Sequence, residues 1–446
     1  MTSDTRRHAR AALPALVGVC LLAVPAVMTG PAAASDLPTA IDRAAAAVEP
    51  RVIAWRRDIH QHPELSNREH RTGALVGDHL EALGLEVRRG VAHTGVVGLL
   101  RGPAGGKVVA LRADMDALPV TEATDLPFAS VERATYLGRE VGVMHACGHD
   151  AHTAILMGVA EVLAGVRERL PGSVVFVFQP AEEGPPEGEA GGAELMLAQG
   201  AFDDPAPQAV FGLHTTHQHP VGALAFTEGA AMAGSDRLTI RVRGSQTHAA
   251  YPWQGVDPIA VAARLVTALH AIPAREVDAR IASVVSIGAI HGGVRHNIIP
   301  DEVELLGTIR SLSPEQRALL LEKVHRTTAG IAASAGAEAS VEISEGNPIT
   351  YNEPALTRRM LPTLERVAGA DRVLTVLPAT GAEDFAYYQQ RVPGLFFWLG
   401  VRDPAVAASQ AAPNHSPGFL VDERALLLGV RALSRLAIDF LAPGPT

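Results

Sequence analysis

The chain has 446 residues, of which 47% are hydrophobic and 19% are charged, and its formal net charge is -10. A chain of this length exceeds what a single hydrophobic core usually serves, so the sequence predicts two domains in an ordinary globular protein. The negative net charge argues against a nucleic-acid partner, because the phosphate backbone would be repelled.

The first 34 residues have the features of a signal peptide. Three arginines between positions 6 and 10 precede an apolar stretch that runs to about Met28, and alanines at positions 32–34 offer an A-x-A cleavage site. Two prolines interrupt the short apolar stretch, which disfavours the alternative of a stable membrane anchor. We therefore expect an exported, secreted or extracytoplasmic protein that is cleaved near Ala34. The Arg6-Arg7 pair leaves open twin-arginine as well as general secretory export.

Cleavage at this point would leave Cys147 as the sole cysteine of the mature chain. A lone cysteine in an exported protein cannot form an internal disulfide. Cys147 is therefore either a buried filler or a functional thiolate, and its sequence neighbours must decide between the two.

Four short apolar runs have the pattern of buried parallel strands, and polar residues follow each of them. Helical patterns occupy 50–60, 72–83 and 152–170, which favours an α/β sheet covered on both faces. In such sheets the active site lies beyond the carboxyl ends of the strands. The four predicted strands are Lys107–Ala113, Ser173–Phe178, Ala209–Leu213 and Gly394–Leu399.

The pattern changes between Ser235 and Ser344, where strands alternate apolar and polar residues. The predicted order is βαββαβ, a ferredoxin-like unit inserted into the first domain. We expect a signal peptide at 1–34, a catalytic domain at 35–234 and 345–446, and the inserted domain at 235–344. The elements predicted in the insert are Arg237–Arg243, Asp257–Ala271, Ile281–Ile290, Glu302–Ile309, Pro314–Ser334 and Ala339–Ile343.

Clusters of chemically reactive side chains follow predicted strands or lie in loops. Taken singly, each has a simple structural explanation, such as a helix cap or a solvated surface. Together they supply one thiolate, several imidazoles and several carboxylates, which is the ligand set of Zn²⁺, Co²⁺ or Mn²⁺. The clusters are Arg112–Asp116, His145–Asp150, Gln179–Gly184, Leu213-His214 and Asn414–Pro417.

Several longer motifs, in order over nearly the whole mature chain, resemble the M20 metallopeptidase family. The similarity is strongest to its amidohydrolase branch, which contains hippurate hydrolases and plant auxin-conjugate hydrolases. The motifs are RADMDALP (112–119), MHACGHDAHT (144–153), FQPAEEG (178–184), GLH (212–214), THAAYPWQGVDPI (247–259), GGVRHNIIPDEVELLGTIR (292–310), GAEDF (381–385) and NHSPGF (414–419).

The resemblance implies two divalent metal ions, zinc, manganese or cobalt, in a metallohydrolase catalytic domain. The matching ligand positions are Cys147, His149, Glu183, His214 and His415, with the cysteine shared by the two ions.

The same resemblance assigns the proton transfer to Glu182, which would activate a metal-bound water. Asp114 stands where other branches have a metal-binding histidine, and the Cys-x-His pair replaces that ligand. Asp114 and Asp116 are therefore expected to support the ligands rather than to bind metal.

The inserted domain is implied to act as a lid and to join two subunits in a homodimer. His248 matches a histidine that stabilises the oxyanion across the subunit interface, and Asn297 and Arg310 match residues that bind the substrate carboxylate. A planar guanidinium suits a carboxylate because it donates to both oxygens. A strand-end salt bridge is the structural alternative for Arg310.

The predicted reaction is hydrolysis of the amide bond of small N-acyl amino acids, which releases a free amino acid and a carboxylic acid. Two alternatives remain open: a dipeptidase or carboxypeptidase acting on small peptides, and a non-catalytic ligand-binding member of the fold.

Some positions depart from the hippurate-hydrolase pattern, and they leave the acyl group open. Gln246-Thr247, Trp253 and Arg295-His296 differ from the usual residues near the presumed substrate end. His217 and His219 compete with His214 as ligand candidates, and His60 and His62 are expected to be loop or supporting residues.

Overall fold

The computed structural model describes residues 1–2, 8, 36–103 and 105–442. The predicted signal peptide at 1–34 therefore lies almost entirely outside the described residues. All helices and strands that are described belong to one compact unit beginning at Leu37. None of these helices combines the length and the apolar character needed to cross a membrane.

Eight strands of the described chain form the central sheet, in the order β1-β2-β6-β3-β7-β18-β8-β17. The neighbours β6, β3, β7 and β18 are mutually parallel, which confirms the four predicted strands and the mostly parallel α/β class. The bounds are β1 Glu86–Val91, β2 Gly95–Leu100, β3 Val108–Asp114, β6 Ser173–Gln179, β7 Val210–Pro220, β8 Leu224–Phe226, β17 Val373–Thr375 and β18 Gly394–Arg402.

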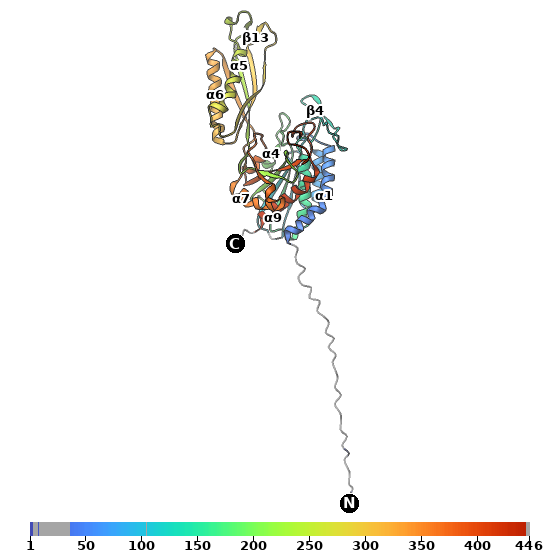
Figure 1. Ribbon diagram of the computed structural model, residues 1–446. Helices are drawn as coiled ribbons and strands as arrows, with labels where there is room; N and C mark the ends of the chain where they lie inside the picture. The colour runs from blue at the N-terminus through green and yellow to red at the C-terminus, as the bar shows by residue number, and fades with distance from the viewer. Residues whose placement is uncertain (3–7, 9–35, 104, 443–446) are drawn as a thin grey trace. The chain divides into compact units, whose positions relative to one another are not determined.

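Helices cover both faces of this sheet, as the continuous apolar strands require. In β6, Val174 and Phe176 face one hydrophobic core, whereas Val175 and Val177 face the other. Figure 1 shows α1 and α9 together on the first face. That face carries α1 Leu37–Gln61, α2 His70–Ala82, α3 His149–Ala164, α7 Pro354–Ala368 and α9 Leu426–Leu441, and the second carries α4 Gly192–Ala198 and α8 Phe385–Gln389.

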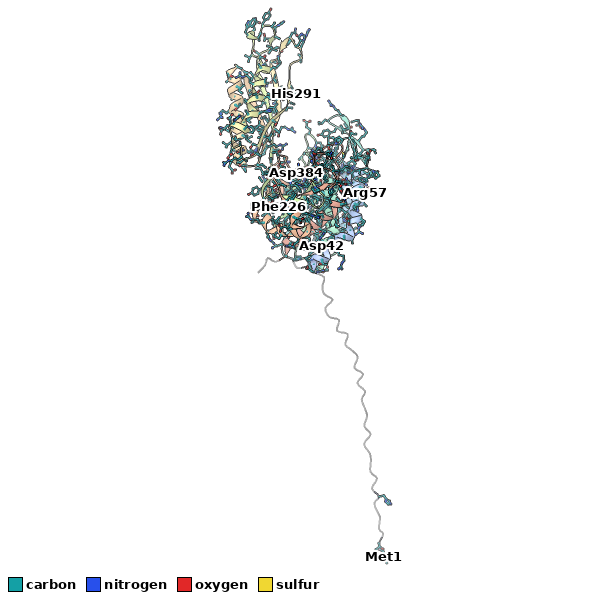
Figure 2. The ribbon with its side chains drawn as sticks, in the orientation of Figure 1. Met1, Asp42, Arg57, Phe226, His291 and Asp384 are labelled. Carbon is teal, nitrogen blue, oxygen red and sulfur yellow. The ribbon has the colours of Figure 1, made fainter. Side chains whose placement is uncertain are left out.

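A second, antiparallel sheet has the order β12-β14-β10-β15 and its own core around Leu238, Leu265 and Leu320. Its chain order is βαββαβ, as predicted, and Figure 1 shows α5 and α6 side by side against it. His291, labelled in Figure 2, belongs to its strand β12. The elements are β10 Gly234–Arg243, α5 Pro258–Arg275, β12 Ser283–Gly292, β14 Glu302–Ser311, α6 Pro314–Ser334 and β15 Glu338–Glu345.

Three two-stranded sheets complete the described strands. They pair β4 Arg133–Tyr136 with β5 Arg139–Gly142, β9 Gly229–Met232 with β16 Thr350–Asn352, and β11 Thr247–His248 with β13 Ile298–Ile299.

Two predicted helix starts were wrong. Helix α1 begins at Leu37, not at Pro50, because Ile41, Ala45, Val48 and Val52 continue one buried stripe through the exposed proline. Helix α3 begins at His149, not at His152, since the left-handed Gly148 directly precedes its first turn. The helix ends at Ala164, and a separate short helical turn occupies Arg167–Arg169.

Candidate metal centre

Strand pairing brings the reactive segments together at one edge of the central sheet. Asp114 at the end of β3 lies in register with Gln179 at the end of β6. The segments that follow β3 and β6 therefore leave the sheet side by side. The first leads to Asp116, and the second leads to Glu182 and Glu183. His214 does not follow its strand as predicted, because β7 continues to Pro220 along β18 and keeps His214 within the sheet.

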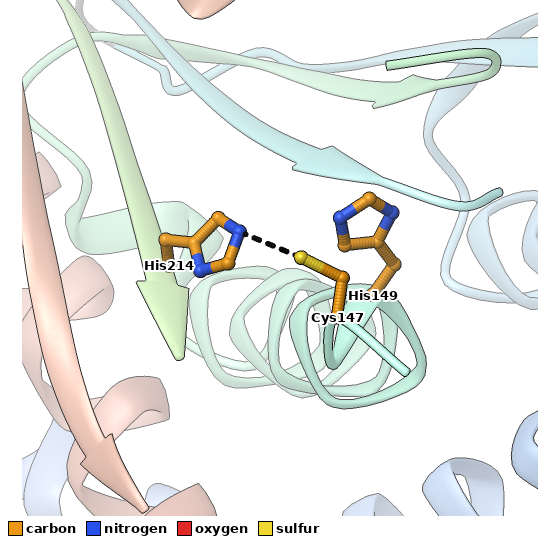
Figure 3. Close-up of side chains that lie close together, drawn as sticks. All are labelled: Cys147, His149 and His214. Atoms are coloured by element: carbon orange, nitrogen blue, oxygen red, sulfur yellow. Dashed lines mark hydrogen bonds between the residues drawn. The ribbon is translucent and has the colours of Figure 1, made fainter. Parts of the chain in front are cut away.

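A glycine turn presents two further side chains to the same edge. Gly148 has φ 93°, and a Cβ atom there would lie 2.2 Å from Thr215 Oγ1. Only glycine fits both the left-handed backbone and this close approach. The turn places Cys147 and His149 on either side of it, and Figure 3 shows the two imidazoles of His149 and His214 flanking the Cys147 sulfur.

The five predicted ligands converge, and Cys147 lies at their centre. Its Sγ is 3.3 Å from Nε2 of His214 and 3.1 Å from Nε2 of His415, which in turn lies 3.0 Å from Oε1 of Glu183. Cys147, His149 and His214 form one group of potential ligands, and Cys147, Glu183 and His415 form a second, with ligand atoms within 4.8 Å of one another in each. The shared sulfur matches the expectation of two neighbouring ions.

Backbone carbonyls occupy one ring nitrogen in each of two imidazoles of the centre. His214 Nδ1 lies 2.7 Å from the Thr215 carbonyl oxygen, and His149 Nδ1 lies 2.9 Å from the Asp116 carbonyl oxygen. A carbonyl only accepts, so Nδ1 carries a proton and Nε2 is the nitrogen that remains for a metal. His149 Nε2 is buried without a hydrogen-bond partner. Rings held in this way are typical of metal ligands, so the residues fit the implied ions.

The surroundings of two of the imidazoles, His149 and His415, also favour positive charge. Burial lowers the pKa of His149, but Asp114, Asp116 and Cys147 together raise it well above its usual value. Hydrogen bonds to Cys147 and Glu183 raise the pKa of His415 to about 10. Both rings therefore attract positive charge, and a divalent ion bound by their Nε2 atoms would displace these protons. The mixed sulfur, nitrogen and oxygen donor set suits Zn²⁺, Co²⁺ or Mn²⁺.

The backbone is strained at two positions of the centre. Ala181, directly before Glu182, has φ 55°, and His415 has φ 67°. Residues without glycine's freedom hold this left-handed conformation only where their surroundings enforce it. The amide of His415 donates to the Ala146 carbonyl at 2.7 Å, which fixes this loop to the segment that carries Cys147.

Glu182 lies beside the cluster and makes no hydrogen bond within the described chain. Its Oε2 is 3.9 Å from His149 Nε2, and burial, reinforced by Glu383 and Glu183, raises its pKa well above the usual range. Nearby divalent ions would oppose this shift, because opposite charge favours the ionised carboxylate.

The two predicted supporting aspartates have different partners. Asp116 Oδ1 lies 3.2 Å from His149 Nδ1, so it orients a predicted ligand directly. Asp114 instead accepts from His152 Nδ1 at 2.6 Å. The other nitrogen of His152 accepts the Thr215 amide at 2.8 Å, so neither ring nitrogen of His152 is left for a metal.

A cavity of about 990 Å³ opens onto the cluster, and Arg310 of β14 lines it together with Cys147, Glu183 and His415. No hydrogen bond or ion pair of the Arg310 side chain is found among the described residues. Asp236, the acid that acts on the pKa of Arg310, is instead held by two bonds from Arg317, at 2.7 and 2.9 Å. The alternative of a strand-end salt bridge is therefore not observed.

His248 and Asn297, the other two predicted site residues of the inserted domain, do not line this cavity. They lie close to each other, because β11 pairs with β13 and the Ala249 amide donates to the Asn297 carbonyl at 3.1 Å. His248 is exposed, whereas the Asn297 side-chain oxygen is buried without a partner.

Four other histidines were considered from the sequence alone. His217 and His219 line the cavity but join none of the converging ligand groups in the described chain, and His217 Nδ1 lies 2.9 Å from Asn414 Oδ1. His60 is buried at the end of α1 between Asp150 and Glu122, and the more exposed His62 bonds the Asp58 carbonyl.

Sequence reasoning gave no role to three further buried acids, Glu69, Glu383 and Asp384. Arg112 donates to Glu383 and Asp384 at 2.9 Å each, and Asp384 is labelled in Figure 2. The GAEDF motif marked these two acids without showing their partner. Glu69 was missed altogether, because it lies outside all of the quoted motifs and its partners are distant in the sequence.

Comparison with known proteins agrees with this geometry. The sequence profile of peptidase family M20/M25/M40 matches residues 110–439. Thermostable carboxypeptidase 2 of Saccharolobus solfataricus is 40% identical over 395 residues, 88% of this chain and 96% of the relative. N-acetylcysteine deacetylase of Bacillus subtilis is 36% identical over 392 residues, 88% of this chain and 97% of the relative.

A solved structure supports the same relationship. The Bacillus subtilis YXEP protein, described as a dinuclear metal-binding peptidase from the M20 family, superposes with a TM-score of 0.73 at 35% identity. The match covers 89% of this chain and 99% of that chain. With its profile match, its full-length relatives and its cluster of thiol, imidazole and carboxylate ligands, the chain belongs to peptidase family M20 and is a metal-dependent hydrolase.

Proposed function

We propose that the enzyme hydrolyses the amide bond of N-acyl amino acids. This proposal rests on the unpaired Arg310, which lines the same cavity as Cys147, Glu182 and His415. A substrate with a carboxylate beside its scissile amide would satisfy this guanidinium while its carbonyl lies at the metal centre. Met232, Val376, Leu377 and Trp398 line the same cavity and offer apolar surface to an acyl group or side chain.

The names of two relatives fit this substrate class. Both a carboxypeptidase and an N-acetylcysteine deacetylase release an amino acid that bears a free carboxylate. Carboxypeptidase activity on small peptides is the second candidate, because thermostable carboxypeptidase 2 is 40% identical to this chain.

The residues divide the chemistry between them. Cys147, His149 and His214 would hold one ion, and Cys147, Glu183 and His415 the other. When bound, the ions would make water a stronger nucleophile at neutral pH and polarise the scissile carbonyl. Glu182 accepts the proton of the attacking water and returns it to the leaving nitrogen. Arg310 binds the substrate carboxylate and thereby orients the amide.

We further propose that His248 acts in the site of a second subunit of a homodimer. The Ala250 amide donates to His248 Nδ1 at 3.0 Å, so the neutral ring carries its proton on Nε2. That nitrogen is a donor on an exposed side chain and lies outside its own chain's cavity. It is therefore suited to stabilise an oxyanion in a partner's site. Asn297, close to His248, would bind the substrate carboxylate in the same partner site.

The substrate class is tested by the release of free amino acid from a defined panel. The metal-loaded enzyme would be given N-acetyl and N-benzoyl amino acids and, in parallel, unblocked dipeptides of the same residues. We expect higher kcat/KM for the acylated series. Faster cleavage of the dipeptides would favour the peptidase, and turnover of neither series would remove both candidates.

Export of the enzyme is also proposed, from the arginines and the apolar stretch within residues 1–34. Mass spectrometry of secreted material should find an N-terminus at or near Ser35, and an intact Met1 would contradict cleavage.

A further inference from the structure

The carboxyl group of Glu69 is buried at the start of α2, where it bonds three different segments of the chain. Its Oε1 accepts the amide of Asn67 at 3.1 Å and the amide of Ala181 at 2.9 Å. Its Oε2 accepts the hydroxyl of Thr94 at 2.5 Å. Glu69 itself neither joins a group of potential ligands nor lines the cavity.

Ala181 is the strained residue that leads into the two glutamates of the centre. It holds a left-handed φ of 55°, which alanine seldom adopts without support. Two residues later, the Glu183 amide donates to Asp116 Oδ2 at 3.0 Å. Glu182 thus lies between two backbone amides, each fixed by a buried carboxyl group from another part of the chain.

From this arrangement we propose that Glu69 is a positioning residue for Glu182 and Glu183. Through its bond to the Ala181 amide, it holds the left-handed turn that directs one glutamate to the ions and the other to the reacting water. The inference rests on the proposed function for the roles of these two side chains. It predicts that kcat and metal affinity depend more on the length of the Glu69 side chain than on its charge.

Two substitutions separate reach from charge. Glu69→Gln keeps an oxygen at the position of Oε1 and removes the charge, whereas Glu69→Asp keeps the charge and shortens the side chain by one methylene. Burial and the nearby Asp116 raise the pKa of Glu69 to about 8, which makes the neutral amide a close substitute. We expect Glu69→Gln to retain the kcat and metal affinity of the wild type.

For Glu69→Asp we expect kcat to fall about 10- to 100-fold, the usual effect of losing a group that orients a metal site. KM should change little, because Arg310 is untouched. Metal affinity, measured by competition with a chromogenic chelator, should fall as well, since Glu183 would be displaced. This readout needs no substrate, so it decides the role of Glu69 even if every compound in the substrate panel proves wrong.

Thr94→Val is the matched control. It removes the hydrogen bond to Oε2 but leaves the Ala181 amide on Oε1, so it should lower Tm without changing kcat or metal affinity. If Glu69→Asp likewise lowers only Tm, Glu69 is merely structural and the proposal fails. If Glu69→Asp does not fold, Glu69→Gln still decides: a tenfold loss of kcat or metal affinity at unchanged Tm would overturn the proposal.

Discussion

Asp116 connects the two halves of the metal centre through opposite oxygens of one carboxylate. Oδ1 lies 3.2 Å from Nδ1 of His149, and Oδ2 accepts the backbone amide of Glu183 at 3.0 Å. A hydroxyl bond from Ser66 at 2.8 Å holds the same Oδ2 in place. One buried side chain thus sets the ring orientation of one predicted ligand and the backbone position of another.

Replacing Asp116 by alanine should therefore weaken metal binding about 10- to 100-fold, because both connections are lost. Isothermal titration with Zn²⁺ or Mn²⁺ would measure the change. Asp58→Asn is the control, since the Asp58 carboxylate pairs with Arg71 at 2.7 Å and belongs to no group of potential ligands, so this change should not affect metal binding. Unchanged affinity in Asp116→Ala would show that His149 needs no such support.

Removal of the ions should abolish activity and lower Tm, because the lone pairs of His149 and His214 and the Cys147 thiolate would lose their common partner. Dialysis against a chelator, followed by addition of Zn²⁺, Co²⁺ or Mn²⁺, should restore part of the rate. Full turnover by rigorously metal-free protein would contradict the assignment.

The adjacent glutamates should respond differently to the same change. Glu182→Gln should keep its metal and lose at least ~10²-fold in kcat, because only the proton transfer is removed. Glu183→Gln should lose metal as well, since its carboxylate lies 3.0 Å from His415 within one ligand group. Elemental analysis beside kinetics tests both, and the reverse pattern would mean that the two roles are exchanged.

Arg310→Met should lower kcat/KM for N-acyl amino acids by about 10- to 100-fold, the usual effect of losing hydrogen bonds between charged groups. Most of the loss should appear in KM, and analogues with a carboxamide in place of the carboxylate should show little change. The control is Arg241→Met on β10, which removes an exposed ion pair with Glu304 at 3.0 Å. An equal loss for acid and amide substrates would exclude carboxylate binding.

Subunit mixing tests whether His248 serves the opposite site. Glu182→Gln and His248→Ala should each be nearly inactive, but hybrids of the two would contain one complete site. Random exchange should therefore restore about a quarter of wild-type activity. Activity that stays at the level of the single variants, with exchange shown by mass spectrometry, would place His248 in its own subunit.

The local pattern of the sequence determined the central sheet and the antiparallel sheet with its two helices. Long apolar runs predicted β3, β6, β7 and β18, and the change to alternating residues after Ser235 predicted the βαββαβ order, because each signal needs only neighbours along the chain. The ligand positions came instead from the resemblance to the M20 family, and of the five only Glu183 follows one of these strands as predicted. The start of α3 and the extension of β7 were missed, because they depend on the Gly148 turn and on pairing with β18.

Only the tertiary structure decided which polar groups share partners. Glu69 and Ala181 are 112 residues apart in the sequence, and Arg112 and Glu383 are 271 apart, so no local pattern connects them. The sequence left Arg310 between a substrate-binding residue and a strand-end salt bridge, and the structure shows no such ion pair, since Asp236 is held by Arg317. Such contacts depend on which side chains become buried together, and burial is a property of the packed fold rather than of any segment of the chain.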